Sequence, residues 1–250
     1  MFKDIVSGLK MYGASFGLVT RLKLWKYFLI PIAISLLTAS CVGLLAWSLS
    51  DNIGHWVAQI WPWEWGAVVF DRIMQFISGA LIIVIGLMLY KHIVMALSAP
   101  FMSPVSEKIE DHLLGETHEH RETSFSHQLW RGIRINMRNL GLELLLTMPI
   151  LLLNFIPIIG NILAVILLFL MQAYYAGFGN MDYTLERHFD YSKSVQFVRK
   201  RRGQAIGNGM VFMLFLFIPV LGVILVLPLS VSAASKQTVQ LLYPDTKEIL

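Results

Sequence analysis

The feature that most constrains this chain is a run of residues, Tyr27 to Leu49, that contains no charged side chain. As a helix the run is roughly 34 Å long, which is enough to cross the hydrocarbon core of a bilayer. A second apolar run extends from Ile73 to Ser98 and is interrupted only near its end, by Lys91 and His92. The two runs predict two transmembrane helices.

The composition agrees with an all-α integral membrane protein. Hydrophobic residues make up 56% of the chain and charged residues only 14%, whereas about a quarter of an ordinary soluble domain is charged. The net charge of +4 is typical of basic cytoplasmic loops, so we expect no nucleic-acid partner. The only cysteine, Cys41, lies inside the first apolar run, which leaves no candidate nucleophile. We therefore expect no enzyme, no cofactor and no metal site, and we interpret the His-rich stretch around 112–127 as a solvated loop.

A repeated interruption marks the second half of the chain. The pattern Phe-Ile-Pro-x-x-Gly breaks one apolar segment at Phe155–Gly160 and another at Phe217–Gly222, 62 residues later. Because both copies occupy the same place within an apolar segment, they indicate an internal repeat. Proline followed by glycine favours a tight reversal of the chain, which predicts two helical hairpins with Pro157, Gly160, Asn161, Pro219 and Gly222 at their tips.

The distribution of Lys and Arg predicts the topology. Five lie in residues 1–26, five in 99–140 and six in 182–205, but only one in 50–72, so the positive-inside rule places the first three segments in the cytoplasm. The first broken segment then begins and ends on the same side. It fits either a re-entrant hairpin or two tight full spans. Its first arm, Gly141 to Ile156, is only about 24 Å long as a helix, which favours the re-entrant form.

The expected organisation is one membrane domain spanning residues 1–250. Its segments are a basic N-terminal segment 1–26, a first span 27–49, a Trp-rich outer loop 50–72, a second span 73–98, cytoplasmic helices 99–140, a first hairpin 141–180, a basic cytoplasmic segment 181–205, a second hairpin 206–235 and a tail 236–250.

The hairpin tips suggest an anion site. The first N–H groups of each second arm, near Gly160 and Gly222, are expected to lack helical partners and to carry the positive end of the helix dipole. Such ends attract anions in transporters. Glu143 is the only carboxylate in the apolar segments, which argues against a cation path. The alternative, that proline and glycine merely pack bent helices, carries equal weight.

Several residues together resemble the CysZ family of bacterial sulfate permeases, over about residues 5 to 240. They are Ala99-Pro100-Phe101 with Glu107 and Glu110 behind it, the paired Phe-Ile-Pro-x-x-Gly bends, Asp182-Tyr183 and Pro228. The resemblance implies a multi-pass homo-oligomer in lipid of the bacterial inner membrane, with two full spans and two half-penetrating hairpins. It also implies a role in sulfate uptake for cysteine biosynthesis.

The segment before the first span departs from the family pattern. Members carry Gly-Leu-Arg there, an element linked to sulfate binding, whereas this chain reads Lys23-Leu24-Trp25-Lys26. Glycine would let backbone N–H groups close around an oxyanion, and arginine would offer two parallel donors. The site either persists with Lys23 and Lys26 as donors or has been lost.

Two hypotheses follow. The chain is a permease or channel for sulfate or a related oxyanion, captured by Lys23 and Lys26, or a non-transporting membrane scaffold of the same fold. We also expect a buried charge network beneath the hairpins, in which Glu107 and Glu110 pair with Arg131 or Arg134.

Overall fold

In the computed structural model, the described residues are 1–59, 66–115, 123–216, 218 and 221–244, and their regular secondary structure is entirely helical. The chain divides into two compact units, Met1–Ile32 with Met95–Leu250, and Ala33–Val94. Among the described residues, three helical stretches are long and apolar enough to cross a membrane: Leu24–Ala58, Phe125–Phe155 and Ile159–His188.

The smaller unit, Ala33–Val94, contains most of α2 (Leu29–Ala58) and α3 (Ala67–Leu97), which run antiparallel. An ion pair between His55 and Asp71, 3.2 Å from Nδ1 to Oδ1, joins the two helices near their connection. Both helices extend into residues 50–72, so the expected outer loop is mostly helical. Trp56 lies exposed on α2, while Trp61, Trp63 and Trp65 fall outside the described residues.

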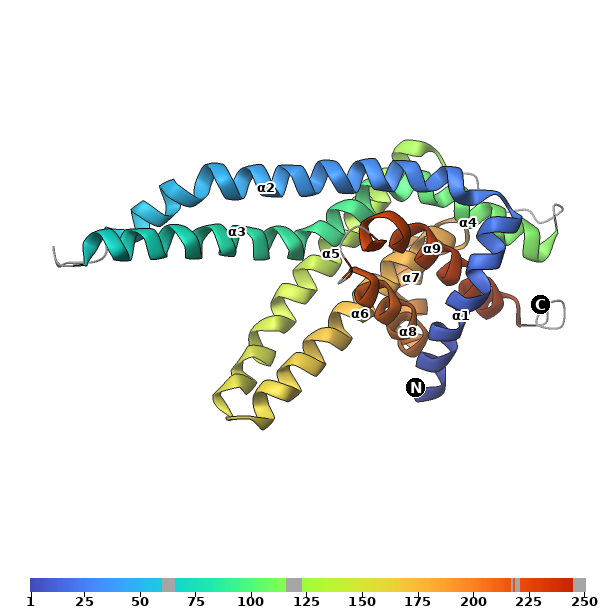
Figure 1. Cartoon of the computed structure of the whole chain (residues 1–250). Helices are drawn as coiled ribbons and strands as arrows, with labels where there is room; N and C mark the ends of the chain where they lie inside the picture. The colour runs from blue at the N-terminus through green and yellow to red at the C-terminus, as the bar shows by residue number, and fades with distance from the viewer. Residues whose placement is uncertain (60–65, 116–122, 217, 219–220, 245–250) are drawn as a thin grey trace. The chain divides into compact units, whose positions relative to one another are not determined.

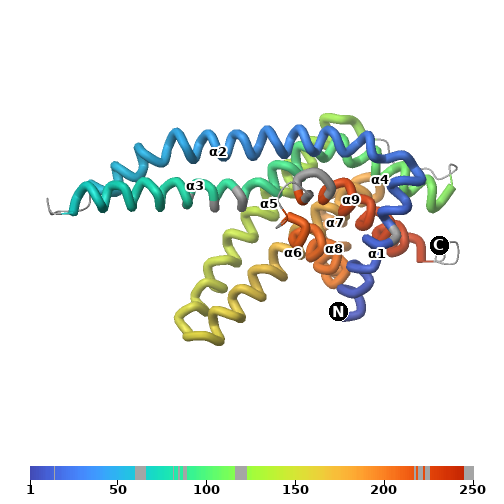
Figure 2. Tube along the Cα trace, viewed as in Figure 1, coloured from blue at the N-terminus to red at the C-terminus, as the bar shows by residue number. Residues whose placement is uncertain are grey.

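The larger unit is built around α6 (Ile159–His188) and α8 (Arg202–Leu216). The two helices approach very closely, because a β-carbon at Gly177 would overlap the Ala205 carbonyl and one at Gly209 would overlap the Ala173 carbonyl. Close approach through small residues is the usual way that helices pack in membranes. Figure 2 shows α1 (Phe2–Arg21) and α9 (Leu221–Leu242) beside α8, and these four helices form the centre of the unit.

Helix α5 (Phe125–Leu151), the short 3₁₀ helix η2 (Leu152–Phe155) and α6 form a long hairpin, whose turn is yellow in Figure 1. Helix α5 begins at Phe125, sixteen residues before Gly141, where the first arm is predicted to start. Ser124 caps that start by accepting a hydrogen bond from the His127 N–H. Helix α6 also continues beyond Asn180 as far as His188.

The second broken segment forms the shorter helices α8 and α9, with Phe217, Pro219 and Val220 outside the described residues. The larger unit also contains α4 (Ala99–Leu114) and α7 (Tyr191–Lys200). The end of α6, α7 and the start of α8 together occupy the segment 181–205 that the charge count places in the cytoplasm. His118, His120, Glu116 and Glu119 of the His-rich stretch lie outside the described residues.

Candidate functional site

The Lys23–Lys26 turn closes α1. The N–H of Leu22 donates to the Leu18 carbonyl at 3.0 Å, and the N–H of Lys23 donates to the Thr20 carbonyl at 3.1 Å. Lys23 has φ 53° and ψ 39°, the left-handed conformation that commonly ends a helix and that glycine adopts without strain. The sequence therefore folds here as a helix C-terminal cap, with a lysine at the position best suited to glycine.

The side chains of this turn divide into one buried anchor and two exposed cations. Leu24 is fully buried, and the 3₁₀ helix η1 (Leu24–Phe28) that it starts packs against α1, α4 and α9. Lys23 and Lys26 are exposed. Trp25 donates from Nε1 to Thr20 Oγ1 at 3.2 Å, which fixes its ring beside the helix end.

This arrangement decides how the turn can hold an anion. The Leu22 and Lys23 N–H groups are already donated to carbonyls of α1, so these two amides are not available to an oxyanion. The capacity that remains is in the side chains, because each lysine presents an ammonium group with three donors. Lysine serves in this way as a point charge at phosphate sites.

The two Phe-Ile-Pro-x-x-Gly turns share one backbone hydrogen-bonding pattern. In the first, Ile156 N–H donates to the Leu153 carbonyl at 2.9 Å and Gly160 N–H to the Ile156 carbonyl at 3.1 Å. In the second, Ile218 N–H donates to the Phe215 carbonyl at 3.0 Å and Gly222 N–H to the Ile218 carbonyl at 2.8 Å. Each donor and acceptor of the second turn lies 62 residues after its counterpart in the first. The hydrogen bonds thus reproduce the spacing of the sequence repeat.

The same bonds correct the prediction of unpaired amides at the hairpin tips. Besides Gly160 and Gly222, Ile159 donates to the Pro157 carbonyl at 2.7 Å. These amide groups are therefore satisfied within the turns and are not open to a solute. Pro157 and Asn161 are exposed at the tip of the α5–α6 hairpin, and Pro219 lies outside the described residues.

Glu110 of α4 is the centre of a buried charge cluster against the end of α6. It is fully buried and accepts hydrogen bonds from Arg187 at 2.8 Å and 3.1 Å, and its other oxygen contacts His188 Nε2. Arg187 also donates to Ser106 Oγ at 2.9 Å. Burial acts to raise the pKa of Glu110, but the hydrogen bond from His188 and the charge of Arg187 outweigh it and hold this pKa below the ordinary value of 4.5.

Arg131 of α5 is the centre of a second buried cluster. Its guanidinium pairs with Asp182 of α6 and also donates to Ser194 Oγ of α7 at 2.7 Å. The expected partners are thus replaced: Glu110 pairs with Arg187 and His188, while Arg131 pairs with Asp182. Arg134 lies over the Tyr191 ring, 4.1 Å from its centroid. Because both buried arginines are committed to carboxylates, the clusters act as clamps between helices.

Comparison with known proteins places the chain in a family. The family described as sulfate transporter CysZ/etoposide-induced protein 2.4 matches residues 11–227. This chain belongs to that family. Similar proteins include a sulfate transporter CysZ of Pectobacterium atrosepticum, 23% identical over 92% of this chain and 83% of its own length. Others are the sulfate transporters CysZ of Pseudomonas fluorescens and Pseudomonas aeruginosa, 27% and 26% identical, which cover 92% of this chain and 92% and 93% of their own lengths.

Membership of the sulfate transporter CysZ/etoposide-induced protein 2.4 family, together with the three apolar helices, identifies a membrane protein. The matched region contains the Lys23–Lys26 turn, both Phe-Ile-Pro-x-x-Gly turns and both charge clusters. The features predicted from the sequence thus lie inside the part of the chain that defines the family.

The structure also reveals a polar connection in this family member that sequence reasoning missed. Asn180 Nδ2 donates to Asn208 Oδ1 at 2.9 Å, and Asn208 Nδ2 donates to the Ser230 carbonyl at 3.1 Å. Tyr12 donates its hydroxyl to Ser230 Oγ at 2.6 Å. The four residues come from α6, α8, α9 and α1. The four residues lie in four different sequence segments, so no motif links them. The one available signal for this connection was an amide side chain, Asn180 or Asn208, within a mostly apolar stretch.

Proposed function

We propose that this chain carries sulfate or a related oxyanion across the bacterial inner membrane, as a homo-oligomer, and supplies sulfate for cysteine biosynthesis. Support comes from the family match and from relatives named sulfate transporter CysZ. The observation that carries the proposal for this chain is Lys23, a charged residue held in the left-handed conformation beside the first apolar helix. A non-glycine residue in this conformation destabilises the folded state by about 1–2 kcal/mol. Strained residues of this kind cluster at functional sites.

In the proposed mechanism, Lys23 and Lys26 capture the anion at the cytoplasmic end of the first span. Sulfate carries two charges and has no proton to donate at neutral pH, so it needs donors and the absence of carboxylates. The two ammonium groups meet this need, and the turn that presents them is fixed by buried Leu24 and by the bond from Trp25 to Thr20. No enzymatic step is part of the proposal.

We also propose two full spans and two half-penetrating hairpins. Helices α5 and α6 are long, but the apolar part of α5 begins only at Gly141, after Arg138. From there to Phe155 the chain rises about 22 Å, which is less than the roughly 30 Å of a hydrocarbon core. Helix α8 has 15 residues, so it is also about 22 Å long and too short to cross.

The test is sulfate flux into vesicles that contain the purified protein. The double variant Lys23→Gln/Lys26→Gln should lower the flux at least tenfold. The matched control Lys3→Gln/Lys10→Gln removes the same charge from exposed positions of α1 and should leave the flux within twofold of the unchanged protein. Flux no greater than in empty vesicles would instead favour the scaffold alternative, which the internally bonded amides of both turns also favour.

A further inference from the structure

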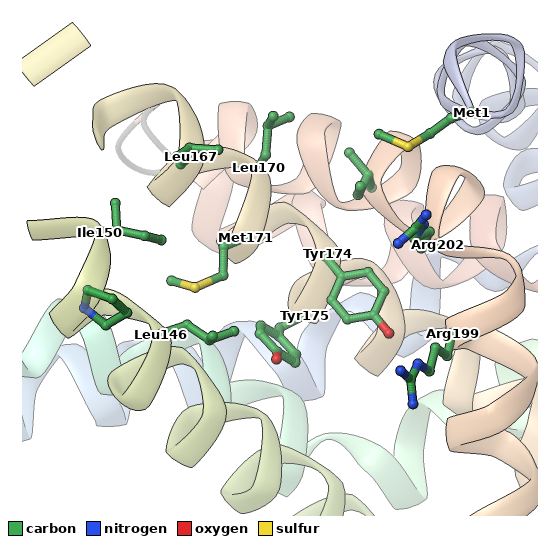
Figure 3. A pocket seen from close by; sticks show the side chains of 12 residues that line it. Met1, Leu146, Ile150, Leu167, Leu170, Met171, Tyr174, Tyr175, Arg199 and Arg202 are labelled. Atoms are coloured by element: carbon green, nitrogen blue, oxygen red, sulfur yellow. The ribbon is translucent and has the colours of Figure 1, made fainter. Parts of the chain in front are cut away.

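A groove of about 770 Å³ lies where the α5–α6 hairpin meets α8 and the C-terminal end of α7. One side of the groove is apolar along the hairpin. This wall is formed by Leu146, Pro149, Ile150, Leu167, Leu170 and Met171. Figure 3 shows Leu146 and Ile150 on one arm of the hairpin, and Leu167, Leu170 and Met171 on the other. A wall of this kind suits a hydrocarbon chain.

The other end of the groove is polar and basic. Tyr174, Arg199 and Arg202 line it, and the Tyr174 hydroxyl lies on the same side as the two arginines in Figure 3. Both arginines are exposed, and none of the described residues that line the groove is a carboxylate. Two guanidinium groups without a lining carboxylate form an end that suits a phosphate.

The two halves follow the expected depth in the bilayer. Arg199 and Arg202 belong to the basic segment that the charge count places in the cytoplasm, at the level of the lipid headgroups. Along α6, Leu167 lies about 10 Å from Tyr174, on the side of the hairpin tip. The groove therefore changes from basic to apolar in the direction that leads from the headgroup layer into the hydrocarbon.

We propose that this groove binds one anionic phospholipid, with the phosphate on Arg199 and Arg202 and an acyl chain along the apolar wall. A free oxyanion would use only the two arginines and leave the wall empty. An uncharged lipid would use the wall and leave the arginines without a counter-charge. Only an anionic amphiphile matches both halves. The proposal does not depend on sulfate transport, since it concerns a different surface and a different ligand.

The test measures lipid binding by the full-length protein in detergent, by native mass spectrometry and by the shift in unfolding temperature on addition of phosphatidylglycerol. Phosphatidylcholine serves as the lipid without net charge, and glycerol phosphate as the headgroup without chains. The variant Arg199→Gln/Arg202→Gln removes the proposed phosphate contacts. The control Lys200→Gln/Arg201→Gln removes the same charge from the same basic run, at residues that do not line the groove.

We expect phosphatidylglycerol to bind the unchanged protein and the control alike, and to bind Arg199→Gln/Arg202→Gln roughly thirtyfold more weakly, as expected for the loss of two basic contacts. The variant Leu146→Trp keeps both arginines but fills part of the groove beside the apolar wall, and should weaken the binding of phosphatidylglycerol at least fivefold. Equal weakening in the control would show general surface attraction and overturn the proposal. Glycerol phosphate binding as tightly as the lipid, or no effect of Leu146→Trp, would overturn it too, by showing that only the headgroup is recognised.

Discussion

Arg131 and Asp182 form a two-point ion pair between α5 and α6. Arg131 Nε donates to Asp182 Oδ2 at 2.9 Å, and Nη2 donates to Oδ1 at 2.8 Å. The remaining guanidinium nitrogen donates to the carbonyl of Phe189 at 2.8 Å, and Nη2 also reaches Ser194 of α7. One side chain of α5 thus connects α6, α7 and the turn between them.

This pairing predicts a large effect of neutralising Asp182. The variant Asp182→Asn leaves the Arg131 charge buried without a counter-charge, which should lower the free energy of unfolding by about 3 kcal/mol. The measurement is thermal or denaturant unfolding in detergent. Asp71→Asn is the matched control, because it removes a carboxylate that pairs with exposed His55 and should cost less than about 1 kcal/mol. Equal losses in the two variants would contradict the clamp.

Glu110 predicts a loss of stability in acid. Its pKa in the folded protein lies below the ordinary value, because His188 and Arg187 favour the charged form over the effect of burial. The unfolded chain therefore binds more protons, so the stability that Glu110 contributes is present above about pH 4.5 and is lost as the pH falls through the lower folded pKa. The unfolding temperature should drop as the pH falls below about 4.5, with a shallower slope in Glu110→Gln. Identical slopes in the unchanged protein and in Glu110→Gln would be evidence against this role.

The clusters also show what the sequence could predict. An α-helical membrane protein with a broken, repeated second half was predictable, because long uncharged runs and two Pro/Gly breaks leave few other folds. The partners of Glu110 and Arg131 were not, since Asp182, Arg187 and His188 lie on the last turns of α6. They belong to residues 181–205, which the charge count predicts to be a basic cytoplasmic segment. Helix α6 carries them into the interior because it continues through Asn180 instead of ending there.

The amide groups at the turns were mispredicted for a related reason. Counting the first N–H groups of a helix as unpaired assumes that the preceding residues turn away from it. In both turns a carbonyl of the same motif, from Ile156 or Ile218, faces back toward the glycine. The spacing of proline and glycine predicts a reversal, but only the backbone conformation shows where the carbonyls point.

Lys23 predicts opposite effects on stability and on transport. The variant Lys23→Gly relieves the left-handed strain and should raise the free energy of unfolding by up to about 1 kcal/mol, part of the gain being offset by the freer unfolded chain. Sulfate flux should nevertheless fall, because one of the two exposed ammonium groups is gone. Lys26→Gly is the matched control, since Lys26 lies in a 3₁₀ helix where glycine should cost about 0.5–1 kcal/mol. A stabilised Lys23→Gly protein with unchanged flux would show that the lysine charge is not used.

The geometry of the two turns predicts that even a change to alanine at Gly160 or Gly222 destabilises the protein. A β-carbon at Gly160 would overlap the Leu153 carbonyl oxygen, and one at Gly222 would overlap the Phe215 carbonyl oxygen, at equivalent positions of the repeat. Because backbone blocks the added atom in both cases, Gly160→Ala and Gly222→Ala should each lower the free energy of unfolding by about 1–3 kcal/mol. Gly141→Ala is the control: it lies within α5, has no atom near the added carbon, and should be neutral or stabilising by up to about 1 kcal/mol. The measurement is the unfolding temperature of each variant. If both turns share one geometry, the unfolding temperatures of Gly160→Ala and Gly222→Ala should both fall, while that of Gly141→Ala should not.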